Sequence, residues 1–132
     1  MSADPHQYRL LIVDDEEPVL NFVDRTLRAA GYHTTLAPNG RAALDVVSVS
    51  PAFDLLLTDL MMPGMRGDDL ARRMRVASAD LKVLYLTGFS DALFASRPLL
   101  WENETFLEKP ASQSALLEAV SRALFGHSRG PL

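Results

Sequence analysis

The chain has 132 residues, 48% of them apolar and 23% charged, which is enough for one compact core and too few for two independent domains. It has no cysteine, and this excludes disulfide bonds, thiolate catalysis and zinc–sulfur sites. The formal net charge of −4 at pH 7 argues against a domain that mainly neutralises nucleic-acid phosphates, but it leaves a cation site open.

The first residues, MSADPHQY, lack the apolar core and basic flank of a signal peptide. No apolar run approaches the ~20 residues that a helix needs to cross a membrane. We therefore expect a soluble, cytoplasmic protein with no membrane partner and no direct nucleic-acid binding. We expect one domain over residues 8–126, between an N-terminal tail at 1–7 and a C-terminal tail at 127–132.

Short apolar or β-branched runs of strand length alternate with segments of helical periodicity. The expected strands are, in chain order, 8–13, 32–37, 53–58, 81–87 and 104–109. The expected helices with clear periodicity are 18–30, 40–49, 69–77 and 112–125. The segment 90–101 has less helical regularity, because Pro98 would interrupt a helix of full length there.

Single residues predict where several of these helices begin and end. Pro18 suits the first turn of the first helix. Asn39 and Asp68 can cap the second and third helices through their side-chain oxygens. Gly126 suits the end of the last helix, where a left-handed residue is common.

Five strands alternating with five helices predict an α/β domain with a parallel sheet. The nearly continuous apolar runs suit strands that are covered on both faces. Short connections require right-handed crossovers, which place helices on both sides of a doubly wound sheet. In such a sheet the binding crevice lies at the carboxyl ends of the strands, where the strand order reverses.

Polar residues follow the expected strands at this edge. They are Asp14, Asp15 and Glu16 after the first strand, Asp59 after the third, Thr87 and Gly88 after the fourth, and Lys109 and Pro110 after the fifth. Carboxylates gathered in one crevice repel one another, and a bound cation is one remedy. Mg²⁺ prefers oxygen ligands and is typically held by one or two carboxylates together with a phosphate. The crevice is therefore expected to bind Mg²⁺.

Asp59 lies within the stretch LLLTDLMMPGMRG, residues 55–67. The apolar run before it fixes the carboxylate at the end of a rigid strand, and the proline and two glycines after it let the chain turn away. A carboxylate held in this way can act as a nucleophile that forms an acyl-phosphate. The hydroxyl of Thr87 and the ammonium of Lys109 can receive the phosphoryl oxygens.

Four segments, LLIVDDEEPV, DLLLTDLMMPGMRG, LYLTGFS and FLEKP, resemble the motifs of the receiver domain of bacterial two-component response regulators, whose archetype is the chemotaxis regulator. They stand in the right order and spacing, and the resemblance covers roughly residues 8 to 125. It implies a flavodoxin-like fold with strand order 2-1-3-4-5. It also implies a phosphohistidine on a sensor kinase or phosphotransfer protein as the phosphoryl donor.

The resemblance implies which residues hold the metal and which one reacts. Asp59 is the expected phosphoacceptor. Asp15 and Asp59 are expected to bind Mg²⁺ directly, together with the backbone carbonyl of Met61, while Asp14 acts largely through water.

The remaining site residues are expected to bind and sense the phosphoryl group. The resemblance gives this role to Thr87 and Lys109, helped by the backbone amides of Met61 and Gly88. It also implies a cis peptide bond between Lys109 and Pro110.

Thr87 and Phe106 are the expected switch residues. Phe106 stands where the archetype has a tyrosine, so it can still turn inward when Thr87 moves but has no hydroxyl to donate. The surface formed by the fourth helix, the fifth strand and the fifth helix is then expected to change shape. A partner, or a second copy of the chain in a homodimer, is expected to dock there.

Two function classes remain open at this point. The chain is either a phosphorylatable receiver or a pseudo-receiver, a binding module of the same fold that is regulated without phosphate. A metal-dependent phosphatase is disfavoured because no second acid follows Asp59 at D-x-D spacing, so we expect catalysis only of the chain's own phosphorylation and dephosphorylation. His6, His33 and His127 have no metal-ligand spacing and are expected to be surface residues. The basic cluster Arg72, Arg73 and Arg75 is expected to be a solvated helix face.

Overall fold

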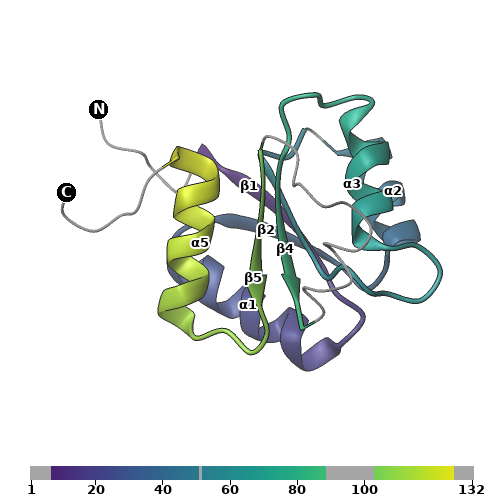
Figure 1. The fold of residues 1–132 in the computed structure, drawn as a ribbon. Helices are drawn as coiled ribbons and strands as arrows, with labels where there is room; N and C mark the ends of the chain where they lie inside the picture. Colours follow the sequence, from purple (N-terminus) through teal and green to yellow (C-terminus); the bar gives the residue numbers. More distant parts are fainter. Residues whose placement is uncertain (1–6, 51, 89–102, 127–132) are drawn as a thin grey trace.

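The computed structural model describes residues 7–50, 52–88 and 103–126 (Figure 1). The strands are β1 (Arg9–Val13), β2 (His33–Ala37), β3 (Leu55–Thr58), β4 (Lys82–Thr87) and β5 (Glu104–Glu108). The helices in this part of the chain are α1 (Glu17–Ala29), α2 (Gly40–Val49), α3 (Gly67–Arg75) and α5 (Gln113–Phe125). The helix expected within 90–101 lies outside the described residues.

All five strands run parallel in one sheet, in the order β2-β1-β3-β4-β5. Helices α1 and α5 lie on one side of the sheet, and α2 and α3 lie on the other (Figure 1). The predicted α/β class, the parallel sheet and the strand order are confirmed. Among the described helices none is long and apolar enough to cross a membrane.

Residues 10–13 of strand β1 are all apolar because the strand lies inside the sheet and is covered on both faces there. Leu10 and Ile12 pack in the core beneath α1 and α5, and Leu11 and Val13 pack in the core on the α2 and α3 side. All four side chains are buried. Burial on both faces fixes the position of the strand end, and the candidate site begins at the next residue.

Three of the four predicted helix boundaries are confirmed. Asn39 caps α2, since its side chain accepts a hydrogen bond from the amide of Ala42. Pro18 lies in the first turn of α1, and Gly126 ends α5 in the left-handed conformation with φ 77°.

The prediction that Asp68 caps the third helix was wrong. Helix α3 begins one residue before it, at Gly67, and its N-cap residue is Arg66. Asp68 instead lies in the first helical turn, where its carboxylate accepts from the Arg66 guanidinium at 3.1 Å. The helix begins this early because the Gly67 amide donates to the carbonyl of Leu60 and closes the turn after β3.

The expectation for the basic cluster holds for Arg72 and Arg73, which are exposed, and was wrong for Arg75. The side chain of Arg75 is 10% exposed and forms an ion pair of 2.6 Å with Glu104, which is 1% exposed. The hydroxyl of Tyr85 donates to the same carboxylate at 3.1 Å. This buried cluster joins the end of α3 to β4 and β5. Its charged partner lies 29 residues away in sequence, so helical spacing gave no sign of it.

Candidate functional site

The carboxyl ends of the strands gather the predicted polar residues at one edge of the sheet, the lower edge in Figure 1. Strands β1 and β3 are neighbours, and their register pairs Val13 with Thr58. The residues that follow, Asp14 and Asp59, are therefore brought side by side. The amide of Asp59 donates to the carbonyl of Val13 at 3.0 Å, which holds the backbone in place beyond the end of the strand.

Three carboxylates form an acidic cluster here. Asp14, Asp15 and Asp59 each offer one oxygen, and these oxygens all lie within 4.8 Å of one another. Asp14 and Asp59 are buried, and Asp15 is exposed. Carboxylate oxygens at this spacing, one of them open to solvent, can hold a hard metal cation.

Lys109 follows β5 and reaches back over the cluster. Its Nζ lies 2.9 Å from Glu16, 3.1 Å from Asp14 and 3.5 Å from Asp59. The amide of Lys109 donates to the carbonyl of Thr87 at 3.0 Å, so the chain stays joined to β4 beyond the strand. The peptide bond between Lys109 and Pro110 is cis, as predicted.

Burial and charged neighbours shift the pKa values of Asp59, Asp14 and Lys109. Burial raises the pKa of Asp59 from 3.8 to about 6, with a contribution from the Asp14 charge, while the Lys109 ammonium acts in the opposite direction. Burial also raises the pKa of Asp14, opposed by the amide of Glu16 and by Lys109. Burial alone would lower the pKa of Lys109, but its hydrogen bonds to Glu16 and Asp14 outweigh burial and raise it to about 12. At neutral pH Asp59, with a pKa of about 6, is therefore mostly ionised and lies beside the charged ammonium of Lys109.

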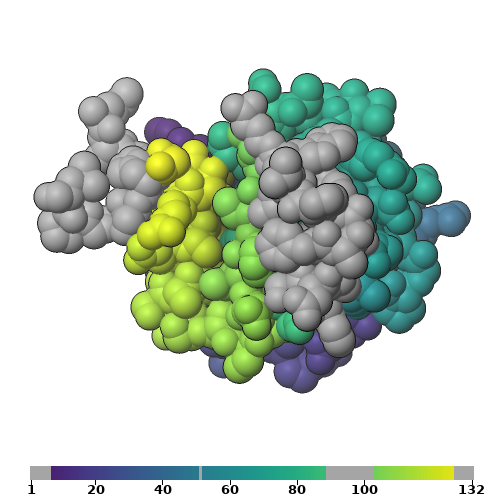
Figure 2. All heavy atoms as spheres, in the orientation of Figure 1, coloured from purple at the N-terminus to yellow at the C-terminus, as the bar shows by residue number. Residues whose placement is uncertain are grey.

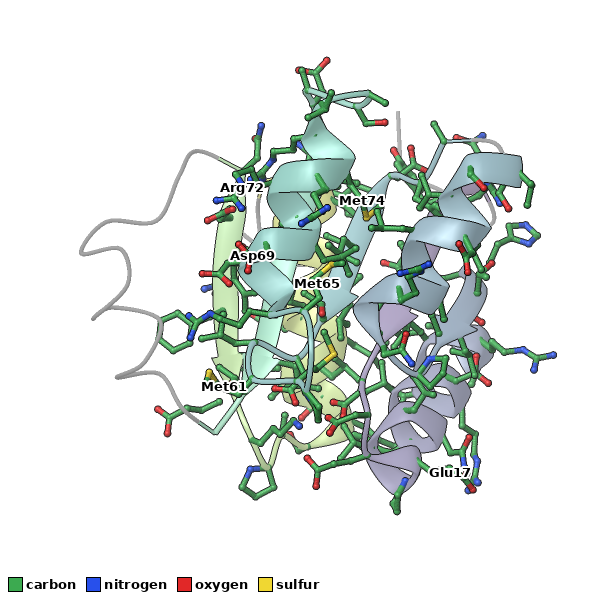
Figure 3. All side chains as sticks on the ribbon, turned by 90° about the vertical axis from the view of Figure 1, so that its right-hand side faces the viewer. Glu17, Met61, Met65, Asp69, Arg72 and Met74 are labelled. Carbon is green, nitrogen blue, oxygen red and sulfur yellow. The ribbon has the colours of Figure 1, made fainter. Side chains whose placement is uncertain are left out.

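Met61 and Arg66 belong to the loop that follows β3 and Asp59. Met61 is 40% exposed, and its sulfur accepts from the Arg66 guanidinium at 3.3 Å. Figure 3 places Met61 at the same end of the molecule as Glu17, at the start of α1. The backbone amide of Met61 acts to lower the pKa of Asp59, so it faces the carboxylate. The contact with Arg66 was not predicted, because nothing in the sequence pairs a thioether with a guanidinium.

Gly67 is required by a close approach of two backbone segments. A Cβ atom built on this residue would lie 2.1 Å from the carbonyl oxygen of Asp59 and 3.0 Å from Cγ2 of Thr58. The sequence indicated a glycine that helps the chain to turn. The structure gives a stronger reason, since any side chain at residue 67 would displace the backbone of Asp59.

Thr87 and Phe106 lie on one face of the sheet. Thr87 is fully buried at the end of β4, and Phe106 lies on the neighbouring strand β5, paired in register with Tyr85. Alternate residues of a strand point to the same face, so Tyr85 and Thr87 share the face on which Phe106 projects. Phe106 is half-buried against the core cluster that contains Tyr85. Gly88, the next residue along the chain, is exposed.

Of the histidines expected on the surface, His33 is exposed at the start of β2. His6 and His127 lie outside the described residues. Trp101, in the connection leading to β5, also lies outside them.

Comparison with known protein families identifies the family of this chain. Residues 10–121 match the model of the response regulator receiver domain. The chain belongs to this family. Receiver domains act in two-component systems, where an aspartate is phosphorylated and where sensor kinases or phosphotransfer proteins are the interacting partners. None of the comparisons favours the pseudo-receiver alternative.

Individual relatives agree with this assignment. The chain is 42% identical over 116 residues to the response regulator receiver protein CpdR of Brucella abortus, covering 88% of this chain and 96% of that protein. It is 34% identical over 109 residues to the transcriptional regulatory protein YrkP of Bacillus subtilis, covering 83% of this chain and 46% of that protein. The chain thus spans less than half the length of the second relative.

A solved structure gives the same result for the fold. The receiver domain from the hybrid histidine kinase CckA superimposes with a TM-score of 0.74 and 32% sequence identity. The match covers 88% of this chain and 98% of that domain. The chain therefore shares its fold with solved receiver domains.

Proposed function

We propose that this receiver domain accepts a phosphoryl group on Asp59 from a phosphohistidine of a sensor kinase or phosphotransfer protein. The observation that supports this most strongly is the position of Asp59. Its carboxylate lies at the end of a buried strand, within 4.8 Å of oxygens of Asp14 and Asp15 and 3.5 Å from the Lys109 ammonium. Phosphoryl transfer needs chiefly positioning and charge neutralisation, and these neighbours supply both.

We propose Mg²⁺ as the cation of this site. The donor set fits it, since carboxylate oxygens from Asp14, Asp15 and Asp59 carry more negative charge than Lys109 offsets. Asp15, Asp59 and the carbonyl of Met61 would hold the ion directly, and Asp14 would hold it through water. When bound, Mg²⁺ neutralises charge that develops on the phosphoryl oxygens.

The carboxylate of Asp59 then attacks the phosphorus atom. A P–O bond forms to Asp59 as the P–N bond to the donor imidazole breaks, and the electron pair of that bond stays on the imidazole nitrogen. The reaction needs ionised Asp59, which a pKa of about 6 provides at neutral pH. Thr87 and Lys109, with the backbone amides of Met61 and Gly88, would hold the phosphoryl oxygens.

Thr87 and Phe106 would pass this event to the surface. A hydroxyl gains more from an anionic oxygen than from a neutral acceptor, so Thr87 would move toward the phosphoryl group. Phe106, on the same sheet face, would turn into the space that Thr87 leaves. Phe106 starts half-buried, so its ring has apolar area left to bury in this movement.

The output surface would include β5 and α5, which adjoin on the face of the molecule seen in Figure 2. Thr105 and Leu107 of β5 and Ala115 and Ala119 of α5 line a groove between the two elements. We propose that a partner protein, or a second copy of the chain, binds there. Direct nucleic-acid binding is not part of this role.

We also propose that the domain comprises residues 8–126 between tails at 1–7 and 127–132, and that it acts in the cytoplasm. It would catalyse only its own phosphorylation and dephosphorylation, rather than turn over a separate substrate. A lack of turnover with phosphate esters would be consistent with this.

Incubation with acetyl phosphate tests the proposed function. Intact-mass measurement is expected to show one added phosphoryl group in Mg²⁺ and none when a chelator removes the cation. Asp59→Asn is expected to lose the adduct, because an amide cannot form the acyl-phosphate. Asp45→Asn, which neutralises an exposed carboxylate on α2, is expected to load like the parent and serves as the matched control. Equal loading of the parent and of Asp59→Asn would show that another residue accepts the phosphoryl group.

A further inference from the structure

Glu16 contacts the lysine of the site without belonging to the proposed metal or phosphoryl ligands. Its Oε1 lies 2.9 Å from Lys109 Nζ, which is shorter than the distance from Nζ to Asp14 or to Asp59. Glu16 is the N-cap residue of α1, but its side chain forms no capping hydrogen bond. The side chain therefore reaches across to the end of β5 instead of stabilising its own helix.

Lys109 interacts with three carboxylates before any phosphoryl group is present. A lysine ammonium has three N–H donors and no acceptor. Within the described part of the chain its ion-pair partners are three carboxylates, those of Asp14, Glu16 and Asp59. A phosphoryl group on Asp59 brings new anionic oxygens, which compete with these carboxylates for the three donors of Lys109.

The three carboxylates differ in how easily they release the lysine. The side chains of Asp14 and Asp59 are 3% and 7% exposed, and Asp14 also accepts from the amide of Glu16 at 2.8 Å. The side chain of Glu16 is 60% exposed. An exposed carboxylate regains hydration when its ion pair breaks, whereas a buried one does not. Glu16 is therefore the partner that Lys109 can leave at the smallest cost.

We propose that Glu16 is a positioning residue that holds Lys109 in the unphosphorylated chain and competes with the phosphoryl group for it. The inference rests on the proposed function, because it assigns Lys109 to the phosphoryl oxygens. Exchange of Lys109 from Glu16 to the phosphoryl group is then one step of activation. Shortening or removing the Glu16 side chain removes the competitor and favours the phosphorylated arrangement.

Three variants distinguish the contact between Glu16 and Lys109 from a general effect of negative charge near the site. Glu16→Ala removes the carboxylate together with the methylene groups that bring it to Lys109. Glu16→Asp keeps the charge, but its side chain is one methylene too short for the contact. Glu17→Ala removes the same charge from the neighbouring exposed residue, which has no ion pair with Lys109 among those found in the described residues. Since Glu16 makes no capping bond, all three are expected to fold like the parent, as thermal unfolding can verify.

The measurement is the affinity for beryllofluoride, a phosphoryl mimic, by ¹⁹F NMR titration at saturating Mg²⁺. We expect roughly two- to five-fold tighter binding in Glu16→Ala and in Glu16→Asp, the range of an exposed ion pair, and parental affinity in Glu17→Ala. The affinity for Mg²⁺ alone, titrated separately, is expected to change less than the affinity for the mimic. A role of Glu16 in folding alone would leave this difference between the two ligands unexplained.

Other results would overturn the proposal. Parental affinity in Glu16→Asp with tighter binding in Glu16→Ala would show that only charge matters, and weaker binding in both would show that Glu16 orients Lys109 toward the phosphoryl group. Equal binding in all four proteins would remove the role of Glu16 while leaving the proposed function intact. No binding of the mimic in the parent would instead contradict the proposed function itself.

Discussion

Asp59→Asn is expected to increase the free energy of unfolding near neutral pH by up to about 3 kcal/mol when a chelator removes divalent cations. Burial raises the pKa of Asp59 from 3.8 to about 6 in the folded chain. A rise of about two pH units, at about 1.4 kcal/mol for each, gives the upper limit. The native carboxylate is thus held at a cost to stability, which asparagine avoids.

The direction of the Asp59 pKa shift determines the pH range in which this effect appears. Because the folded pKa lies above the unfolded one, stability from protonated Asp59 is fully present below about pH 4 and is lost as the pH rises through about 6. The advantage of Asp59→Asn should therefore be absent in acid, grow between these values and stay constant above them. Urea unfolding at several pH values measures it, with Asp45→Asn as the exposed control. A variant that is less stable than the parent near neutral pH would contradict the account.

Gly67→Ala is expected to destabilise the domain by about 1–3 kcal/mol and to impair phosphorylation. The added Cβ would lie 2.1 Å from the Asp59 carbonyl oxygen, and that contact is with backbone rather than with a flexible side chain. Overpacking of this kind costs about 1–3 kcal/mol and occasionally more. Relief requires the start of α3 or the backbone of Asp59 to move, so the nucleophile loses its position.

Gly88→Ala is the matched control for this substitution. No atom of the described residues lies within 4 Å of a Cβ built on Gly88, and the alanine keeps the backbone amide. Chemical unfolding and acetyl phosphate loading should both be near parental in Gly88→Ala and reduced in Gly67→Ala. Similar stability of the two variants would mean that the turn after β3 adapts to a side chain.

The fold was predictable because its central strands carry an unambiguous pattern. Strands covered on both faces carry nearly continuous apolar runs, and LLIV in β1 and LLL in β3 are such runs. Once the strands are parallel and adjacent, their last residues must meet at one edge. That geometry is why Asp14, Asp59 and Lys109 could be placed together from sequence alone.

Other features depend on how far a side chain reaches and which partner it finds. The sequence placed Glu16 at the strand end but could not direct its carboxylate to Lys109, 93 residues away. Arg75 was assigned to a solvated face because its neighbours on the helix are charged, while its partner Glu104 lies on another strand. Asp68 is a good capping residue by type, yet the close approach of Gly67 to Asp59 moved the helix start ahead of it.

Reductive trapping measures most directly whether Asp59 carries the phosphoryl group. Borohydride reduces an aspartyl phosphate to the alcohol and releases phosphate, which converts the modified aspartate into homoserine. The chain is treated with acetyl phosphate and Mg²⁺, reduced and digested, and its peptides are mapped by mass spectrometry. Homoserine is expected at position 59, with none after loading in a chelator. Homoserine at Asp14 or Asp15, or a phosphorylated chain in which Asp59 stays unreduced, would contradict the assignment of the phosphoacceptor.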